Sequence, residues 1–468
     1  MARTRRNGKK QSPRRSAPSR AATTRKKRPP ESSDTFPVVG IGASAGGLEA
    51  FTKLLSHLPA DTGMAFVLVQ HLDPTRESML TEILARSTKM PIQEVRDGMR
   101  IQNNNVYVVP ANANLGLVDG SFRLDQLHRE RGRDMSIDHF LRSLAEHYTS
   151  RAIGVVLSGT LSDGSLGLRA IKAEGGVTFA QDEASARFND MPRAAVASGA
   201  VDFILPPEKI ARELVRMGKH PYIRPAPPPV HVDEPRTDAA DQRRVLSILK
   251  TKTGVDFSNY RQSTLRRRIA RRMALRHVDS LRSYADLLRR DPNEIRALHE
   301  DILITVTAFF RDPDVYKRLA ETVFPSLLRD RAANSPIRIW VPGCSTGEEA
   351  YSIVIALFEA LQESETQPPI LIFATDLSEA AIQKARAGTY LDNALADVSP
   401  ERLQRFFIRT EAGWQVSKSI RNVCIFARQN LTTDPPFSNL DLISCRNLLI
   451  YLEPVSYTHL TLPTIYSV

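Results

Sequence analysis

The sequence predicts an α/β protein in which a doubly wound, mostly parallel sheet is followed by a small helical region and a second sheet. Short apolar runs alternate with helical patterns from Phe36 to residue 218, which indicates parallel strands joined by helices. A proline-rich stretch over 219–241 predicts a semi-rigid, extended spacer. Helical patterns dominate after it, and a second strand–glycine–helix unit begins at Ile337.

Composition and cysteine usage restrict the class of protein. The 468 residues are 42% hydrophobic and 25% charged, which is typical of a soluble protein of two or three domains. The chain has no long apolar run and no signal-peptide core, so we expect a cytoplasmic protein. Cys344, Cys424 and Cys445 are too few and too scattered for a disulfide framework or a metal site. We expect buried thiols and no metal.

Most of the positive charge lies in residues 1–35. They contain twelve Lys/Arg and two acids, and so carry ten of the twelve net positive charges of the chain. No aromatic residue precedes Phe36, and this composition predicts a disordered tail. We interpret it as a solubilising tail in preference to a nucleic-acid-binding one.

The first domain, residues 36–218, is expected to carry its site at the carboxyl ends of its strands, where open parallel sheets bind ligands. The residues just after the strands are therefore the first candidates. Strands are expected at 38–41, 65–69, 106–109, 153–157, 177–180 and 203–205, and helices from 48, near 78–85, at 137–148, from 166 and up to 217.

A glycine-rich corner follows the first strand and fits two motifs. Gly42 to Gly46 fits G-x-S-x-G, in which a serine is exposed on a tight strand-to-helix turn. Gly40 to Ala45 fits G-x-G-x-x-A, in which a pyrophosphate approaches a helix N-terminus. A third interpretation is that the glycines only allow close packing of strand and helix.

The other strand ends favour the serine motif. His71 follows the second strand, and Asp163 lies in the loop after the strand at 153–157. A dinucleotide site would need an acid at the tip of the second strand. We therefore predict Ser44 as a nucleophile, His71 as its base and Asp163 as the group that orients the base, with the amide of Ala45 as an oxyanion donor.

Four blocks of this domain carry a family resemblance. They are residues 42–47, 70–71, 158–164 and 181–185, the last followed by 191–193. In this order they resemble the catalytic domain of CheB-type chemotaxis methylesterases. The resemblance implies hydrolysis of glutamate γ-methyl esters on chemoreceptors, with Ser44, His71 and Asp163 in the triad positions. Regulated members carry a receiver domain before the esterase, and the basic tail stands there in this chain, so we expect no control by phosphorylation in cis.

The helical subdomain, residues 242–312, contains an arginine-rich helix. Helices are expected at 245–251, 263–277 and 280–289. In the second of these, Leu265, Ile269 and Met273 share one face. We expect the remaining faces to form either a solvated cationic surface or a surface that docks on an acidic partner, with RNA as a third interpretation. They carry Arg266, Arg267, Arg268, Arg271, Arg272 and Arg276.

The second strand–glycine–helix unit predicts a nucleotide site. A strand at 337–341 leads into a glycine turn, and no lysine follows Gly347, so the turn is not a phosphate-binding P-loop. A helix continues through Leu361, and the next strand, at 370–374, ends at Asp376. An acid at this position accepts hydrogen bonds from ribose hydroxyls, which indicates an adenosine cofactor.

Blocks 305–312, 343–351 and 444–451 resemble the CheR-type chemoreceptor methyltransferases, which transfer a methyl group from S-adenosyl-L-methionine to receptor glutamates. The resemblance implies a Rossmann-like methyltransferase sheet over 313–455 and a helical subdomain that docks on the receptor. Arg311 and Glu349 are expected to face the methionine end of the cofactor, and Asp376 the ribose. The implied cofactor residues are Thr305, Thr307, Arg311, Glu349, Asp376, Asn430, Leu431, Arg446 and Asn447.

The final segment, residues 456–468, departs from the family, which continues through another helix and a pair of strands. We therefore expect an incomplete sheet and a methyltransferase half that is unstable or weakly active. The resulting hypothesis is a bifunctional chemosensory enzyme. Three alternatives stay open: a general serine esterase, a dinucleotide-dependent enzyme, and a regulatory scaffold that binds receptors without catalysis.

Overall fold

The computed structural model describes residues 36–71, 79–111, 113–126, 135–223, 236–329, 331–332, 334–362, 367–411 and 413–454. The basic tail over 1–35, most of the proline-rich spacer and the segment 456–468 lie outside these ranges. Within them, no helix is both long enough and apolar enough to cross a membrane.

The first domain contains a seven-stranded sheet in the order β3-β4-β2-β1-β7-β8-β9, with every pairing parallel. The central strand β1 pairs with β2 over six residues and with β7 over five. This sheet confirms the predicted doubly wound fold. The strands are β1 (Val38–Ala43), β2 (Ala65–Gln70), β3 (Ile92–Glu94), β4 (Val106–Val108), β7 (Ala152–Val156), β8 (Val177–Gln181) and β9 (Phe203–Leu205).

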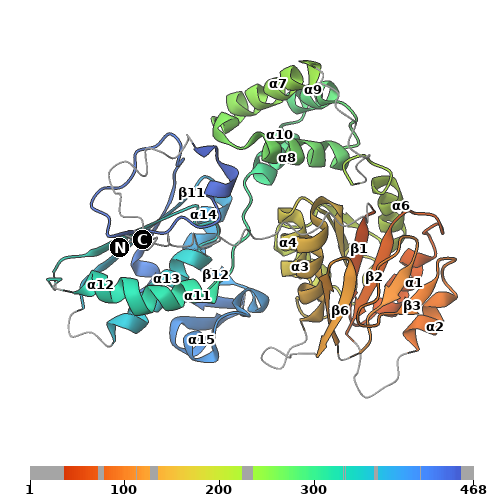
Figure 1. The fold of residues 1–468 in the computed structure, drawn as a ribbon, viewed down its shortest axis with the longest axis horizontal. Helices are drawn as coiled ribbons and strands as arrows, with labels where there is room; N and C mark the ends of the chain where they lie inside the picture. Colours follow the sequence, from red (N-terminus) through yellow and green to blue (C-terminus); the bar gives the residue numbers. More distant parts are fainter. Residues whose placement is uncertain are drawn as a thin grey trace, which may run out of the picture. The chain divides into compact units, whose positions relative to one another are not determined.

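Helices cover both faces of this sheet (Figure 1). On one face pack α1 (Gly47–Leu55), α2 (Leu80–Ala85) and α6 (Pro207–Met217). On the other face pack α3 (Ser136–Tyr148), α4 (Ser165–Ala173) and α5 (Asp190–Ala197). The two apolar layers bury the sheet between them, which leaves the strand ends as the exposed edge for a site.

Gly40 and Gly42 lie inside β1 and face α3. A Cβ at Gly42 would lie 2.3 Å from the Ile137 side chain, and one at Gly40 would lie 2.6 Å from that of Leu141. These glycines therefore let α3 pack closely on the sheet. They do not form a turn around a pyrophosphate, which argues against the dinucleotide interpretation.

The first domain contains elements beyond those predicted. The strand β3 contains a single apolar residue, Ile92, and so gives no apolar run in the sequence. The helix α5 was not anticipated either. A hairpin of β5 (Ala113–Val118) and β6 (Ser121–Gln126) turns at Asp119 and Gly120, both with positive φ. Asp-Gly between two strands is a strong hairpin signal, so this element could have been found from the sequence.

The helical subdomain contains α7 (Arg236–Thr253), α8 (Gln262–Leu275), α9 (Leu281–Arg290) and α10 (Pro292–Ile302). The helix α7 begins inside the stretch predicted as a spacer. The helix α10 was not predicted, although its start carries a clear signal. Asp291 accepts hydrogen bonds from the Asn293 and Glu294 amides, and Pro292 is the first helical residue.

The expectation of a cationic outer surface on α8 is wrong for Arg268 and Arg271. These side chains are 1% and 0% exposed. Arg271 pairs with Asp202 and Asp301, and its Nε donates to the Gly176 carbonyl at 2.9 Å. Such partners offset the cost of removing a guanidinium from water. A charge run read from sequence alone does not reveal these buried partners.

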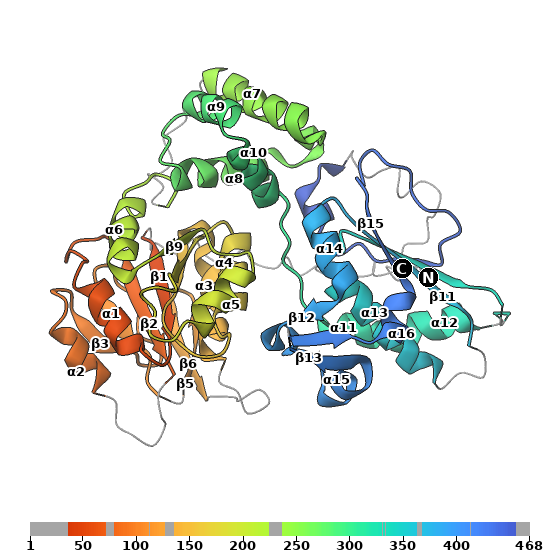
Figure 2. The same cartoon turned by 180° about the vertical axis from the view of Figure 1, so that it is seen from behind.

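The second sheet has the order β15-β11-β10-β16, again with every pairing parallel. Its strands are β10 (Ile337–Pro342), β11 (Ile370–Asp376), β15 (Cys424–Arg428) and β16 (Leu442–Ile443). The helices α13 (Glu348–Leu361) and α14 (Glu379–Ala387) pack beside it (Figure 2). This sheet confirms the predicted second α/β unit.

Smaller elements complete the second α/β unit. An antiparallel sheet in the order β12-β14-β13, which was not predicted, comprises β12 (Thr389–Tyr390), β13 (Phe407–Thr410) and β14 (Gly413–Val416). The short helices are α11 (Pro313–Arg318), α12 (Phe324–Leu328), α15 (Pro400–Phe406) and α16 (Lys418–Asn422). Cys344 is buried as expected, whereas Cys424 and Cys445 are only partly buried because they lie on or beside the outer strands β15 and β16.

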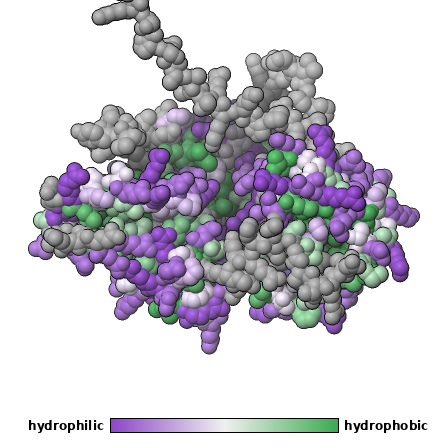
Figure 3. Space-filling view, turned by 60° about the horizontal axis from the view of Figure 1, so that its bottom comes forward, coloured by the Kyte–Doolittle hydropathy of each residue, from purple (hydrophilic) through white to green (hydrophobic). Residues whose placement is uncertain are grey.

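The surface carries few large apolar areas. On the face shown in Figure 3, hydrophilic side chains predominate and hydrophobic ones form separate patches. The exposed apolar residues of the described chain include Met79, Leu161 and Ile408, which lie far apart in sequence. Scattered apolar residues of this kind are normal on soluble domains.

Candidate active sites

Ser44 lies on a tight turn between β1 and α1. Its amide donates to the Ser158 carbonyl at 3.0 Å, and its carbonyl accepts from the Gly47 amide at 2.9 Å. Gly46 precedes α1 with a φ of 76°, and a Cβ there would lie 2.7 Å from the Ser158 Oγ. The corner therefore requires glycine at 46, both for its backbone conformation and for the close approach of the Ser158 loop.

His71 and Asp163 form a shielded hydrogen bond. His71 directly follows β2, and its Nε2 lies 2.8 Å from the Oδ2 of Asp163. The His71 side chain is 17% exposed and that of Asp163 is 2% exposed. A carboxylate at Nε2 fixes the proton on that nitrogen, so Nδ1 becomes the atom that can accept a proton.

The strand register brings the three predicted residues to one edge of the sheet. Ala43 pairs with Gln70, so Ser44 and His71 follow adjacent strand ends. Asp163 comes from the loop after β7, which is the other neighbour of β1. Residues from three adjacent strands thus converge although they are far apart in sequence.

The Asp163 carboxylate is held by four donors. Oδ2 accepts from His71 and from the Ile137 amide at 2.9 Å. Oδ1 accepts from the Asp138 amide at 2.8 Å and from the Gly164 amide at 2.9 Å. Two of these amides belong to the first turn of α3, so the carboxylate also caps that helix. These bonds fix the orientation of the carboxylate toward His71.

The Ala45 amide follows Ser44 at the start of α1. Among the described residues, no acceptor engages this amide. The Ala45 carbonyl accepts from the Ser158 Oγ at 2.9 Å, which holds the turn in place. A free amide that follows a serine just before a helix is a candidate oxyanion donor.

Ser158 and Gln181 support this site and were not assigned roles from the sequence. Besides Ala45, the Ser158 Oγ contacts the backbone of Phe188, and its amide donates to the Gln181 Oε1 at 2.9 Å. Both side chains are buried. The available signal was their position, since Ser158 lies just beyond the end of β7 and Gln181 ends β8.

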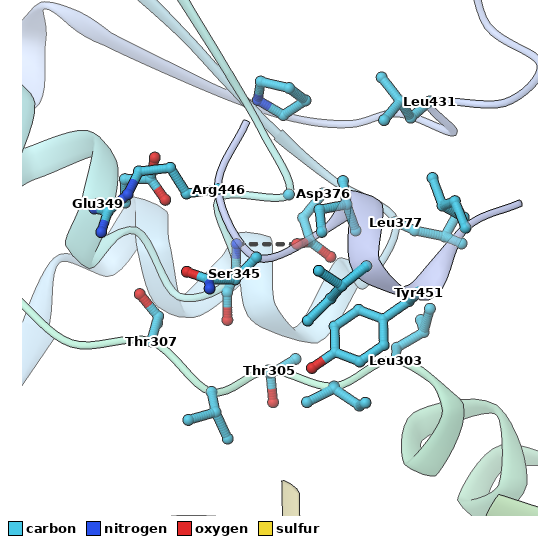
Figure 4. A pocket seen from close by; sticks show the side chains of 18 of the residues that line it. Leu303, Thr305, Thr307, Ser345, Glu349, Asp376, Leu377, Leu431, Arg446 and Tyr451 are labelled. Carbon is cyan, nitrogen blue, oxygen red and sulfur yellow. Dashed lines mark hydrogen bonds between the residues drawn. The ribbon is translucent and has the colours of Figure 1, made fainter. Parts of the chain in front are cut away.

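The second site is a cavity of about 200 Å³ beside the carboxyl ends of β10 and β11. The structure brings all nine predicted cofactor residues to its lining. Thr305 and Thr307 lie on one side and Leu431 on the opposite side (Figure 4). The full set is Thr305, Thr307, Arg311, Glu349, Asp376, Asn430, Leu431, Arg446 and Asn447.

Asp376 ends β11 and is held by the glycine turn. Its Oδ2 accepts from the Ser345 amide at 2.9 Å (Figure 4). Its Oδ1 accepts from the Ser378 amide at 2.8 Å. Burial raises the pKa of this carboxyl, whereas the backbone amides lower it. Each carboxylate oxygen can accept a further hydrogen bond, so the group can still receive two hydroxyl donors.

Glu349 and Arg446 lie together at another part of the cavity (Figure 4). The Glu349 Oε1 accepts from the Ser444 Oγ at 2.6 Å. Burial raises the pKa of Glu349, and Ser444, Arg446 and Arg311 oppose this shift. Arg446 also pairs with Asp312 at 2.6 Å. This part of the cavity therefore combines one carboxylate with two guanidinium groups.

The cavity includes residues that were not predicted. Ser345, with a φ of 51°, presents its amide to Asp376, and Tyr260 and Tyr451 contribute rings to the lining. The side chain of Asn430 turns back to its own loop, because its Oδ1 accepts from the Thr432 amide at 3.1 Å and from the Thr432 hydroxyl. It shapes the loop as well as lining the cavity.

Three family profiles match consecutive parts of the chain. Residues 39–214 match CheB methylesterase, residues 240–303 match the all-alpha domain of CheR methyltransferase, and residues 305–462 match its SAM binding domain. The last match extends into the segment 456–468, which we had expected to depart from the family. That departure was the ground for expecting an unstable or weakly active methyltransferase half, and the ground does not hold up to residue 462.

Several known proteins are similar to the chain over these parts. An uncharacterized 104.1 kDa protein of Rhodobacter capsulatus is 39% identical over 393 residues, which are 80% of this chain and 41% of that protein. A protein-glutamate methylesterase/protein-glutamine glutaminase of Burkholderia thailandensis is 39% identical over 182 residues, 39% of this chain and 53% of that protein. The chain thus spans about half the length of these relatives.

A solved structure, the CheB methylesterase catalytic domain of Thermotoga maritima, is 29% identical in sequence. The match covers 39% of this chain and 98% of the Thermotoga maritima domain, with a TM-score of 0.37.

Proposed function

We propose that this chain both removes and adds methyl groups on chemoreceptor glutamates, because its consecutive parts match CheB methylesterase and the two domains of CheR methyltransferase. The proposal for the esterase half rests on the hydrogen bond between His71 and Asp163. His71 and Ser44 follow the ends of two paired strands. The cavity with its nine predicted residues carries the methyltransferase half. We propose that the protein acts in the cytoplasm.

In the esterase half, Ser44 Oγ attacks the carbonyl carbon of the γ-methyl ester while His71 takes its proton. The Ala45 amide stabilises the negative charge that develops on the carbonyl oxygen. The tetrahedral intermediate collapses, and His71 protonates the methoxide, which leaves as methanol. Water, deprotonated by His71, then attacks the acyl-enzyme and releases the glutamate carboxylate and Ser44. Asp163 orients His71 and stabilises the imidazolium in both steps.

The same site supports a second reaction. The Burkholderia relative is named both a methylesterase and a glutaminase. Attack by Ser44 on a glutamine side-chain amide would follow the same path, with ammonia in place of methanol as the leaving group. A methylated and an amidated receptor fragment therefore both serve as substrates in the assay.

In the methyltransferase half, the residues present fit S-adenosyl-L-methionine. Asp376 can accept from the ribose hydroxyls, and Glu349 and Arg311 match the ammonium and the carboxylate of the methionine end. The bound cofactor supplies an electrophilic methyl group on a sulfonium. The receptor carboxylate is itself the nucleophile, so the work of this chain is to hold the two reactants in line and to exclude water.

The esterase assay measures methanol released by the full chain from a methylated chemoreceptor fragment. We expect release by the wild type and a loss of ~10⁴-fold in Ser44→Ala. Ser56→Ala, an exposed serine at the end of α1, is the matched control. Hydrolysis of simple methyl esters without turnover of the receptor would identify a general serine esterase. Receptor binding with no turnover in the wild type would identify a scaffold.

The cofactor assay is a calorimetric titration of S-adenosyl-L-methionine into the full chain. We expect binding by the wild type and a loss of at least about tenfold in Asp376→Ala, which removes two charge-assisted hydrogen bonds. Asp397→Asn, an exposed aspartate of the same domain, is the control. Equal affinity in the wild type and Asp376→Ala would contradict the assignment of the ribose site.

A further inference from the structure

A second buried carboxyl lies directly behind the His71–Asp163 pair. Asp138 is 2% exposed and lies in the first turn of α3. Its backbone amide donates to the Asp163 Oδ1 at 2.8 Å. Its side-chain Oδ1 accepts from the Gly167 amide at 2.6 Å, in the first turn of α4. Asp138 is therefore one hydrogen bond removed from Asp163 and two from His71.

The two aspartates cap each other's helices. Asp163, just before α4, accepts from the first-turn amides of α3. Asp138, inside α3, accepts from a first-turn amide of α4. This reciprocal arrangement fixes the N-termini of both helices relative to each other. Since the Asp163 carboxylate holds His71, any movement of this helix pair would move the imidazole.

The second side-chain oxygen of Asp138, Oδ2, distinguishes this residue from an ordinary helix-capping aspartate. Among the described residues, the buried Oδ2 has no hydrogen-bond partner. A buried carboxylate without full partners is costly, and a neighbouring carboxylate adds to the cost. Burial, followed by the negative charge of Asp163, raises the pKa of Asp138 from 3.8 to about 7. Asp138 therefore keeps its proton over most of the acidic range.

We propose that Asp138 is a positioning residue of the esterase centre, which acts on His71 through Asp163. This inference rests on the proposed esterase function. While its side chain is protonated, Asp138 donates its backbone amide to the Asp163 carboxylate and adds no negative charge beside it. Once it ionises, a second negative charge lies behind the imidazole and stabilises the imidazolium, so that His71 holds its proton to higher pH. A protonated His71 cannot serve as a base.

Few other charged groups reach Asp138. Arg142, one turn further along α3, lowers its pKa, as do the amides of Gly167 and Leu166. The strands that pack against α3, namely β1, β2, β5 and β7, contribute no charged side chain. The helix α4 brings Arg169 and Lys172, which bind the Thr305 carbonyl and Asp202. Among the described residues, Asp163 is thus the acid that contacts His71 directly, and Asp138 lies behind it.

The test is the titration of the His71 ring by NMR in the full chain, with the signal assigned by its loss in His71→Gln. Asp138→Asn keeps an oxygen for the Gly167 amide and cannot ionise. We expect the part of the His71 titration above about pH 7, where Asp138 is ionised in the wild type, to move to lower pH in this variant, because that negative charge has been removed. Asp125→Asn, at an exposed aspartate on β6, is the control and leaves the titration unchanged. Identical His71 titrations in the wild type and Asp138→Asn would overturn the proposal.

A second measurement applies if Asp138→Asn does not fold. Infrared difference spectroscopy of the wild type detects the carbonyl band of a protonated carboxylic acid. We expect such a band to persist above pH 3.8 and to disappear near pH 7. Its absence throughout this range would overturn the proposal. Neither measurement needs turnover, so a chain that releases no methanol would refute the esterase function and leave this test intact.

Discussion

Gly46 is the residue on which the nucleophile turn depends most. Its φ of 76° and the 2.7 Å contact that a Cβ would make with the Ser158 Oγ are two separate penalties. We expect Gly46→Ala to cost about 1–2 kcal/mol from the left-handed backbone alone. It should also lower esterase kcat/KM by about 10²-fold, because the turn that holds Ser44 must shift. Thermal unfolding and methanol release measure the two effects.

The matched control for that variant is Gly98→Ala. Gly98 has a φ of 74°, and a Cβ there would meet nothing within 4 Å. It therefore carries the backbone strain without the contact. If both variants lost the same stability and kept full esterase activity, the account of the turn would be wrong.

Asp138 gives a pH dependence to the stability of the first domain. Its pKa is raised from 3.8 to about 7 by burial and by Asp163, so between these values the folded chain keeps a proton that the unfolded chain has released. Stability contributed by this group is complete below pH 3.8 and is lost as the pH rises to about 7. Hydrogen exchange of the α3 amides should show protection falling across this window in the wild type, and less so in Asp138→Asn. Parallel curves would contradict the shift.

At the residue scale, the sequence was informative for side chains that follow a recognisable strand. Ser44, His71 and Asp163 could be predicted because each follows a recognisable strand, and parallel strand ends meet at one edge. Asp138 could not, because a carboxyl in the first turn of a helix looks like an ordinary acidic residue near the helix dipole. Only the packing of α3 against α4 shows that it is buried beside Asp163.

At the scale of elements, α8 is held by a buried ion-pair network. We expect Arg271→Ala to destabilise the chain by about 3–5 kcal/mol, because Asp202 and Asp301 would be left buried without their cation. Arg282→Ala, an exposed arginine on α9, should cost less than about 0.5 kcal/mol. The midpoint of thermal unfolding distinguishes the two. Equal midpoints would show that the network contributes little to stability.

Most strands of the first sheet, and β10 and β11 of the second, were predictable, whereas β3, β15 and β16 were not. Strands such as β1 and β11 are continuous apolar runs because both of their faces are covered. β3 reads Ile-Gln-Glu and β16 has only two residues, so neither presents an apolar run like those of the short strands β4 and β9. The prediction of a cationic surface on α8 was wrong for Arg268 and Arg271 for a different reason. Amphipathic periodicity describes one helix, and the partners of Arg271 come from distant segments.

At the scale of the whole molecule, the proposed function gives the two α/β units opposite chemistry. The first places a hydroxyl and an imidazole at the strand ends. The second places a carboxylate and a charged cluster around a cavity. Both use the carboxyl ends of parallel strands, and the difference lies in the side chains placed just beyond each strand. A chain that adds and removes the same methyl group would set a steady level of receptor methylation.

One experiment tests this bifunctional account directly. The full chain is incubated with a chemoreceptor fragment and S-adenosyl-L-methionine labelled in its methyl group, and the label is followed in the fragment and in methanol. We predict that Ser44→Ala accumulates labelled ester on the fragment, whereas the wild type passes the label on to methanol. Asp376→Ala should label neither. An unlabelled fragment with Ser44→Ala, or equal ester accumulation in Ser44→Ala and the wild type, would contradict the account.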